Sequence, residues 1–504
     1  WFANRYNKPG FPLYDYRVYA LAGDGDMMEG VSGEAASTAS HLKLSNLVWI
    51  YDSNLITIEG ATNLAFSEDT DRPTFIVVHS VIGYGAPKKQ GTREAHGEPL
   101  GDEEIRAAKR HYGWPEDAQF LVPPGVREHF DKGMGARGHR LRTAWMDMLT
   151  RYRTEYPDLA AELDQMDQQE LPAGWDADIP TFPADAKGLA TRDSSQKVLN
   201  AIAPHVPWLM GGAADLAPST KSNLTFPGAN SFQADDYAGR NLHFGIREHA
   251  MGSICNGLAL AGLRSYASGF LIFSDYMKPP IRLAAIMELP VIYIFTHDSI
   301  GVGEDGPTHQ PVEQLVALRS VPGLLVIRPA DANEVAEAWR VAMRQHEKPV
   351  ALVLSRQALP TIDRTKYGAA SGVDRGAYVV ADSGGTPDVI LIGTGSELTL
   401  CLGAYEALQA EGVHARVVSM PSWELFESQD DAYKNEVLPH SVLGRVAVEQ
   451  GAVMGWDRYV GWGGAVIGMH TFGASAPAGE LQKKFGFTPE KVLEAARTQA
   501  KRKG

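Results

Sequence analysis

Residues 16–54 read YRVYALAGDGDMMEGVSGEAASTASHLKLSNLVWIYDSN. The first seven of them are strand-like until the GDG turn at 23–25 breaks the run. Residues 31–44 are small and helix-forming, and 47–51 form a second apolar strand. This order of strand, helix and strand predicts parallel strands joined by a right-handed crossover.

The same alternation continues along the chain. A further strand is predicted at 74–79, and two more blocks of alternating strands and helices follow a stretch rich in proline, charge and helix formers. The predicted fold class is therefore α/β, with three stacked domains and mainly parallel sheets. The predicted boundaries are 1–125 for the first domain, 126–190 for a helical linker, 191–365 for the second domain and 373–504 for the third.

Composition excludes several classes of protein. The chain has 504 residues, which suggests about three domains, and 44% hydrophobic with 21% charged residues excludes a disordered chain. A net charge of −14 argues against nucleic-acid binding. Apolar runs stay well below the ~20 residues of a membrane span. With only Cys255 and Cys401, we expect no disulfide framework and a cytoplasmic location.

Two polar positions follow neighbouring predicted strands. Asp24 comes at the end of the first strand and Asn54 at the end of the second. The carboxyl ends of parallel strands are where α/β sheets bind ligands. A carboxylate, an amide oxygen and a nearby carbonyl suit Mg²⁺, which completes its shell with water and phosphate. Gly-Asp-Gly is also ordinary turn chemistry, and Asn often ends a strand, so the pattern alone fits either interpretation.

Longer motifs decide between these interpretations. They are AGDGDMMEG at 22–30, HLKLSN at 41–46, FGIREHAM at 244–251, THDSIGVGEDGPTHQ at 296–310 and LSRQ at 354–357. In this order, and over nearly the whole chain, they resemble the transketolase family of thiamine diphosphate-dependent enzymes. The resemblance implies transfer of a two-carbon ketol group from a ketose phosphate, such as xylulose 5-phosphate, to an aldose phosphate in the pentose phosphate pathway.

The resemblance also implies how the cofactor is held. Mg²⁺, with Ca²⁺ or Mn²⁺ as alternatives, would bind Asp24, Asn54 and the carbonyl of Ile56. Thiamine diphosphate would contact these residues: Gly25, Asn54, His96, Glu248, Phe270, Phe273 and Tyr276. Without the family, His96 would be interpreted as a solvent-exposed residue of a Gly-rich loop. The three aromatic residues would be interpreted as core, because helical spacing of aromatics is more common there.

The resemblance also implies which residues act in catalysis and which recognise the substrate. Glu248 would keep a proton beside the aminopyrimidine nitrogen, provided that burial holds that proton on the carboxyl group; a glutamate at a helix start also favours the helix dipole. The resemblance assigns the binding of the substrate phosphate to Arg192, His297 and Arg356. It assigns hydrogen bonds to the donor hydroxyls to Asp305 and His309, with His309 also transferring a proton. Glu29 and Glu34 would couple the two sites across a dimer. The resemblance implies a homodimer with active sites at the subunit interface.

Two glycine-rich stretches are predicted to be decoys. GVGEDG at 301–306 fits a dinucleotide-binding pattern, but Glu304 and Asp305 would set two negative charges beside a pyrophosphate and Pro307 follows at once. GTGS at 393–396 follows a predicted strand and could hold a phosphate at a helix N-terminus. Because the third domain of the family lies away from catalysis, we interpret it as a tight turn between strand and helix.

The chain departs from the family at two places. It begins at Trp1 rather than Met, and residues 54–73 offer no helix to connect strands 47–51 and 74–79, both of which we expect to be fully buried. We therefore expect the expressed protein to carry further residues before Trp1 and between Thr70 and Asp71. The alternative functions are dihydroxyacetone synthase, 1-deoxyxylulose-5-phosphate synthase, a non-catalytic homologue and, most distantly, a nucleotide-linked dehydrogenase.

Overall fold

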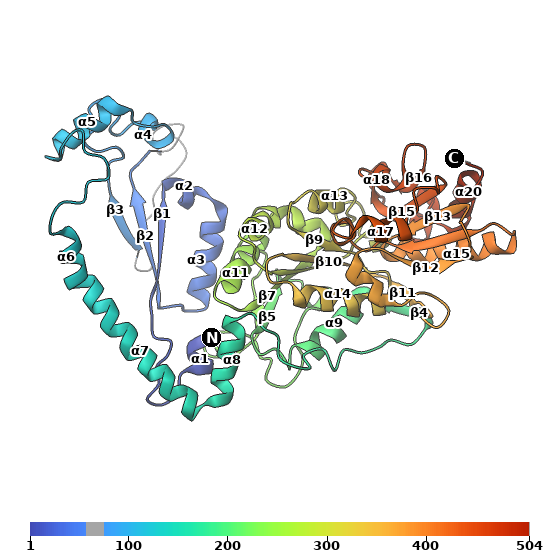
Figure 1. Ribbon diagram of the computed structural model, residues 1–504, viewed down its shortest axis with the longest axis horizontal. Coiled ribbons are helices and arrows are strands. Elements are labelled where there is room, and N and C mark those ends of the chain that lie inside the picture. Colours follow the sequence, from blue (N-terminus) through green and yellow to red (C-terminus); the bar gives the residue numbers. More distant parts are fainter. Residues whose placement is uncertain (57–74, 503–504) are drawn as a thin grey trace. The chain divides into compact units, whose positions relative to one another are not determined.

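The computed structural model describes residues 1–56 and 75–502 (Figure 1). By its internal contacts the chain divides into two compact units. The first contains residues 1–163 and 233–238, and the second contains residues 164–232 and 239–504. The predicted gap between Thr70 and Asp71 lies outside the described residues.

A three-stranded parallel sheet forms the centre of the first unit. Its order is β1 (Val18–Gly23), β2 (Leu47–Ser53) and β3 (Phe75–His79). Two helices, α2 (Asp24–Met28) and α3 (Gly30–His41), join β1 to β2, so the predicted parallel crossover unit is confirmed. Residue pairing in the sheet sets Gly23 beside Asp52, which brings the two strand ends together.

The prediction that these strands are fully buried is wrong. In β2 only Tyr51 of the apolar run 47–51 is buried, and the other four side chains are half-buried. In β3 the Val78 side chain is 45% exposed. Apolar composition resembles that of a central strand, but burial depends on what covers the sheet, and in the described part of this unit α2 is the helix that packs on β1 and β2.

The predicted linker is helical over most of its length. The helices outside the sheet of the first unit are α1 (Phe2–Tyr6), α4 (Arg93–Gly97), α5 (Asp102–His111), α6 (Val126–Phe130), the π-helical η2 (Asp131–Gly135), α7 (Ala136–Glu155) and α8 (Pro157–Asp167), which runs into the second unit. The predicted helical linker also contains a strand at its end. There β4 (Asp185–Ala190) pairs antiparallel with β11 (Ala358–Thr361), a partner too distant along the chain for local patterns to reveal.

The larger sheet of the second unit has six parallel strands. Its order is β6 (Asn241–His243), β5 (Leu209–Ala213), β7 (Arg264–Phe270), β8 (Ile292–Thr296), β10 (Val350–Leu354) and β9 (Leu325–Ile327). Helices α11 (Glu248–Leu260) and α12 (Ser274–Ile286) pack together on one face, and α9 (Thr191–Ile202) and α14 (Ala332–Arg344) pack together on the other (Figure 1). Shorter helices are α10 (Ala217–Thr220), η3 (Leu271–Phe273), η4 (Ile300–Val302) and α13 (Gln314–Arg319).

The second sheet of this unit has five strands, in the order β12 (Tyr378–Asp382), β14 (Ala415–Ser419), β13 (Val389–Gly393), β15 (Arg445–Ala452) and β16 (Ala465–Met469). Only β12 runs antiparallel to its neighbour, which confirms the prediction of mainly parallel sheets. Its helices are η5 (Ala370–Arg375), η6 (Gly395–Glu397), α15 (Leu398–Ala410), α16 (Trp423–Glu427), α17 (Asp431–Val437), α18 (Asp457–Val460), α19 (Ala478–Phe485) and α20 (Pro489–Gln499).

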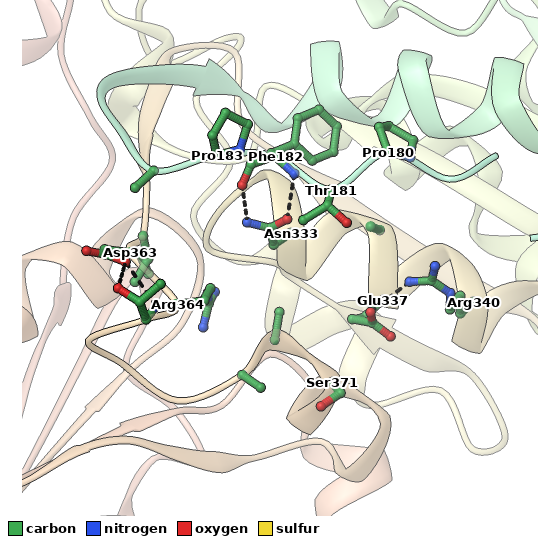
Figure 2. A pocket seen from close by; sticks show the side chains of 16 residues that line it. Pro180, Thr181, Phe182, Pro183, Asn333, Glu337, Arg340, Asp363, Arg364 and Ser371 are labelled. Atoms are coloured by element: carbon green, nitrogen blue, oxygen red, sulfur yellow. Dashed lines mark hydrogen bonds and ion pairs between the residues drawn. The ribbon is translucent and has the colours of Figure 1, made fainter. Parts of the chain in front are cut away.

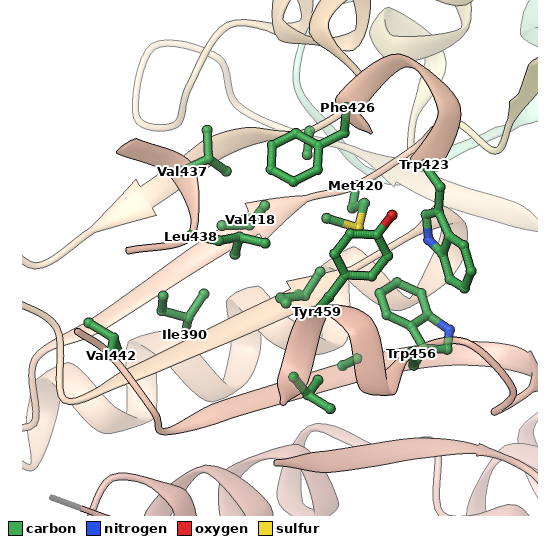
Figure 3. Close-up of a cluster of buried hydrophobic side chains, with 14 of the residues drawn as sticks. Ile390, Val418, Met420, Trp423, Phe426, Val437, Leu438, Val442, Trp456 and Tyr459 are labelled. Carbon is green, nitrogen blue, oxygen red and sulfur yellow. The ribbon is translucent and has the colours of Figure 1, made fainter. Parts of the chain in front are cut away.

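The hydrophobic core beside the five-stranded sheet includes the side chains of Trp423, Trp456 and Tyr459 (Figure 3). The ring of Trp423 lies 5.0 Å from that of Trp456 and 5.2 Å from that of Tyr459. The guanidinium of Arg319, from α13 beside the six-stranded sheet, lies 4.1 Å from the centre of the Trp423 ring and pairs with Glu449 of β15. The two sheets are therefore joined by buried charge as well as by apolar contact. None of the helices in the described residues is long and apolar enough to cross a membrane.

Candidate active site

In the first unit, Asp24 at the end of β1 binds the loop that follows β2. Its carboxylate is 3% exposed. Oδ1 accepts a hydrogen bond of 2.6 Å from the Tyr51 hydroxyl, and Oδ2 accepts bonds of 3.1 and 3.0 Å from the backbone N–H groups of Asn54 and Leu55. Leu55 has a φ of 63°, which such fixed partners help to hold. The structure thus brings together Asp24 and Asn54, the two polar residues predicted at neighbouring strand ends.

The donor set at this loop fits a hard cation. A carboxylate has about four lone-pair positions, and within the described residues Asp24 accepts hydrogen bonds from Tyr51, Asn54 and Leu55. The Asn54 side-chain oxygen accepts a hydrogen bond of 3.1 Å from the backbone N–H of Ile56. The Asn54 amide oxygen and the backbone of Ile56 therefore lie in the same short turn. The described residues contain no cluster of three or more His, Cys, Asp and Glu side chains suited to a metal. A metal here would depend on oxygen atoms of the kind that Mg²⁺ prefers.

The other predicted residues of this unit are more exposed. Gly25 is exposed in α2, and a side-chain carbon added there would meet nothing within 4 Å. His96 is exposed too, but it lies in the short helix α4 rather than in a loop, so that part of the sequence interpretation is wrong. Glu29 precedes α3 and Glu34 lies within it, one turn further along. These placements leave the roles of the four residues as predictions.

In the second unit, five rings gather at the carboxyl ends of β7 and β8. Phe270 ends β7 and stacks on Phe273 with ring centres 5.8 Å apart. His297 lies 3.7 Å from Phe270, and His309 lies 6.2 Å from Phe270 and 5.7 Å from Phe273. Tyr276, 6.1 Å from Phe273, is 64% exposed. Residues predicted to hold the cofactor and residues predicted to bind substrate thus share one cluster.

Glu248 is the first residue of α11, directly after the loop that follows β6. Glu248 is half-buried. The α11 helix packs against both β7 and α12, the elements that carry Phe270 and Tyr276. The fold therefore brings Glu248 to the same end of the sheet as the aromatic cluster.

His297 is both strained and buried. It follows β8 with a φ of 60° and is 3% exposed. Its Nδ1 lies 2.8 Å from the Thr296 hydroxyl. Burial and the nearby positive charges of Arg192 and Arg356 lower the pKa of His297 to about 3, so the imidazole is neutral at pH 7. A neutral imidazole can donate a hydrogen bond to a phosphate without adding a second buried charge.

The two arginines meet through a pair of hydroxyl groups that sequence reasoning missed. Thr191 and Ser355 exchange bonds: their hydroxyls lie 3.0 Å apart, and each accepts a backbone N–H of the other, at 2.6 and 3.1 Å. The next residues along the chain are Arg192 and Arg356, which are thereby held side by side. No local signal could reveal this pairing, because 164 positions separate the two hydroxyls.

Arg192 is incompletely satisfied. Its Nη1 donates to the carbonyl of Ser219 at 2.8 Å, but its Nε is buried without a hydrogen-bond partner. Burial lowers the pKa of Arg192, and the charge of Arg356 adds to the effect. An unpaired buried N–H beside a second guanidinium is a site prepared for an anion. Asp305 is exposed in the loop after η4, and half-buried His309 lies on the aromatic cluster from the same loop.

The groove drawn in Figure 2 lies elsewhere and contains none of the predicted site residues. It has a volume of about 410 Å³ between residues 180–184, α14 and the chain after β11. Of its charged side chains, Arg340 pairs with Glu337 and Asp176, Arg364 pairs with Asp331, and Asp363 accepts hydrogen bonds from Thr365. The predicted site residues therefore lie outside this groove.

Family models divide the chain in the same way as its sheets. The model described as "Transketolase, thiamine diphosphate binding domain" matches residues 1–72 and 68–172, which contain Asp24 and Asn54. "Transketolase, pyrimidine binding domain" matches 187–361, which contains the aromatic cluster and both arginines. "Transketolase-like TK C-terminal domain" matches 376–488. Fold and site together define a thiamine diphosphate-dependent α/β enzyme.

Curated relatives narrow this class to one family. Transketolase of Geobacillus stearothermophilus is 47% identical over 97% of this chain and 78% of its own length, and that of Bacillus subtilis is 45% identical over 97% and 79%. The chain belongs to the transketolase family, and its function is that of a transketolase. Thiamine diphosphate is its cofactor.

Solved structures agree. Transketolase from Leishmania mexicana superimposes with a TM-score of 0.92 at 40% identity, over 99% of this chain and 78% of that one. A Pichia stipitis transketolase in complex with sedoheptulose-7-phosphate gives a TM-score of 0.93 at 36% identity, with the same coverage. The predicted α/β class, with a thiamine diphosphate-binding fold and a C-terminal domain, is confirmed.

Proposed function

We propose that this chain transfers a two-carbon ketol group from a ketose phosphate of the xylulose 5-phosphate type to ribose 5-phosphate or erythrose 4-phosphate, reversibly, in the pentose phosphate pathway. The observation that carries this proposal is the buried, unpaired Nε of Arg192 beside Arg356 and the neutral His297. Two guanidinium groups suit the terminal phosphate of a sugar through bidentate hydrogen bonds. Because His297 packs against the ring of Phe270, a phosphate bound beside His297 would direct the sugar toward the cofactor pocket.

Separate groups of residues would hold the different parts of the cofactor. Asp24, Asn54 and the Ile56 carbonyl would bind a divalent metal, with Mg²⁺ preferred over Ca²⁺ or Mn²⁺. Around the diphosphate we place Gly25 and His96, and around the aminopyrimidine Phe270, Phe273 and Tyr276. When bound, thiamine diphosphate supplies a carbon nucleophile that attacks the ketose carbonyl.

This chain's own residues would then move and hold protons. Glu248, at the start of α11, would keep a proton at the aminopyrimidine nitrogen. His309 would hydrogen-bond a donor hydroxyl and carry the proton that this hydroxyl gains or loses, while Asp305 would orient a second hydroxyl. His297 and Phe270 pack together closely and exclude water from the inner end of the cluster.

We also propose a cytoplasmic homodimer with its active sites at the subunit interface. Supporting this, α11 and α12 expose a group of large apolar side chains, with Leu260 61%, Leu283 46%, Ile286 60% and Met287 44% exposed. Large apolar side chains exposed on two neighbouring helices favour a protein interface there. Glu29 and Glu34 would couple the two sites. The domain boundaries proposed are 1–125, 191–365 and 373–504, with the linker at 126–190.

A ketol-transfer assay tests this function. The protein is supplied with thiamine diphosphate and Mg²⁺, then with xylulose 5-phosphate and ribose 5-phosphate, and the seven-carbon product is measured. We expect turnover that disappears without cofactor. Preference for formaldehyde as acceptor would favour a dihydroxyacetone synthase. Preference for pyruvate with glyceraldehyde phosphate would favour a 1-deoxyxylulose-5-phosphate synthase, and failure to bind cofactor would indicate a non-catalytic homologue.

A further inference from the structure

The segment 296–310 carries three predicted substrate residues, His297, Asp305 and His309. One end is linked through Arg328 to the turn after β13, and the other end is held by residues 473–475, in the chain after β16. One contact is an ion-pair bridge near His297, and the other is a set of hydrogen bonds near His309.

The first contact is made by Arg328, which directly follows β9 and is completely buried. Its Nε donates to Oδ2 of Asp298 at 2.8 Å, and its Nη1 donates to the carbonyl of Thr394 at 2.9 Å. The same Nη1 pairs with the carboxylate of Glu397. One guanidinium therefore connects the residue next to His297 with the turn after β13.

This turn is shaped around the guanidinium. Gly395 has a φ of 55°, and a side-chain carbon there would lie 2.6 Å from Cζ of Arg328. Glu397 also accepts the N–H of Gln450 at 3.0 Å. Although burial opposes its charge, the carboxylates of Glu397 and Asp298 raise the pKa of Arg328, so it stays charged. The prediction of a tight turn at 393–396 is confirmed, and this turn accommodates an arginine.

The second contact holds the far end of the segment. Gln310 donates from Nε2 to the carbonyl of Gly303 at 2.7 Å and to that of Ala474 at 2.9 Å. The hydroxyl of Ser475 donates to the carbonyl of Glu304 at 2.5 Å. Gly473 packs closely against this side chain, because a carbon added there would lie 1.7 Å from Oε1 of Gln310 and would displace it. The loop bearing Asp305 and His309 thus depends on residues 473–475.

We propose that Arg328 is a positioning residue for phosphate recognition, and that through it the C-terminal domain sets the placement of His297. The inference rests on the proposed role of His297 in binding the donor phosphate. A histidine in the left-handed region is strained and keeps that conformation only where its surroundings fix it. The Arg328–Asp298 pair fixes the next residue along the chain and so keeps the imidazole beside Arg192 and Arg356.

The test compares a phosphorylated with an unphosphorylated donor. Arg328→Lys keeps the charge but loses the fork that reaches both carboxylates, and Glu397→Gln keeps the size of the side chain while removing its charge. We expect each variant to raise KM for xylulose 5-phosphate tenfold or more, with kcat/KM for hydroxypyruvate and thiamine diphosphate affinity within about twofold of wild type. Thermal denaturation shows whether each of the two variants folds. If one does not fold, the comparison of donors with the other variant tests the proposal.

Two further variants make the outcome decisive. Arg364→Lys is the matched control. Half-buried Arg364 pairs with buried Asp331 and donates to the hydroxyl of Tyr378 in β12, and none of its hydrogen bonds or ion pairs among the described residues involves segment 296–310. It should leave both donors unaffected. His297→Asn measures the phosphate role itself. If His297→Asn is donor-selective while the Arg328 and Glu397 variants lose both donors equally or neither, the positioning role is wrong. If His297→Asn shows no selectivity, the proposed phosphate site is wrong, and this inference with it.

Discussion

Neutralising Asp24 should separate its structural role from its role toward the metal. Alanine would remove three hydrogen bonds to a carboxylate that is 3% exposed. At about 1.5–3 kcal/mol per bond to a charged group, this would disrupt the loop itself. Asparagine is the sharper change, because its oxygen can accept from the Asn54 and Leu55 N–H groups and its amide can donate to Tyr51. Asp24→Asn therefore removes the charge while retaining the loop.

The expected loss follows from the charge that is removed. Two unit charges 4 Å apart interact by about 4 kcal/mol at an effective dielectric constant of about 20, which corresponds to about a thousandfold in affinity. We expect thiamine diphosphate affinity in the presence of Mg²⁺ to fall by at least that factor in Asp24→Asn, with the thermal midpoint of the cofactor-free protein nearly unchanged. Isothermal titration calorimetry and thermal denaturation measure the two quantities.

A control lies on the neighbouring strand. Asp52 is exposed at the end of β2 and pairs in register with Gly23, so Asp52→Asn neutralises a carboxylate at the same edge of the sheet without touching the loop. It should bind cofactor as the wild type does. Wild-type affinity in Asp24→Asn would refute the metal assignment. Equal losses in both variants would mean that general surface charge, and not Asp24, governs binding.

Three further outcomes are expected. Glu248→Gln should slow hydrogen–deuterium exchange at C2 of bound thiamine diphosphate by about 10²–10⁴-fold with little change in cofactor affinity, and exchange at the wild-type rate would contradict the role of Glu248. Because the pKa of His297 is about 3 in the folded protein and about 6.5 when unfolded, the unfolded state binds the extra proton, so stability should fall as pH drops from 6.5 toward 3; denaturant titrations should show a shallower fall for His297→Asn. Sedimentation at assay concentration should give a dimer, and an active monomer would exclude an interface site.

The sequence by itself determined the local elements and the chemistry of single positions. Strands β1 and β2 and helix α3 could be predicted because apolar periodicity and turn residues act over a few positions. The meeting of Asp24 with Asn54 could be predicted too, because parallel strands joined by one crossover place their carboxyl ends together. Most roles, however, came from the resemblance of long motifs, since a glutamate before a helix or an aromatic triplet fits several functions.

Only the tertiary structure decided which distant residues act together. The Thr191–Ser355 pair, the β4–β11 ladder and the bridge from Asp298 through Arg328 to Glu397 join positions that no periodicity connects. Burial was decided in the same way: 47–51 is as apolar as a central strand, yet most of it remains half-exposed. Whether a side chain is buried, paired or strained depends on what packs against it from elsewhere in the chain, and that information is set by the fold as a whole.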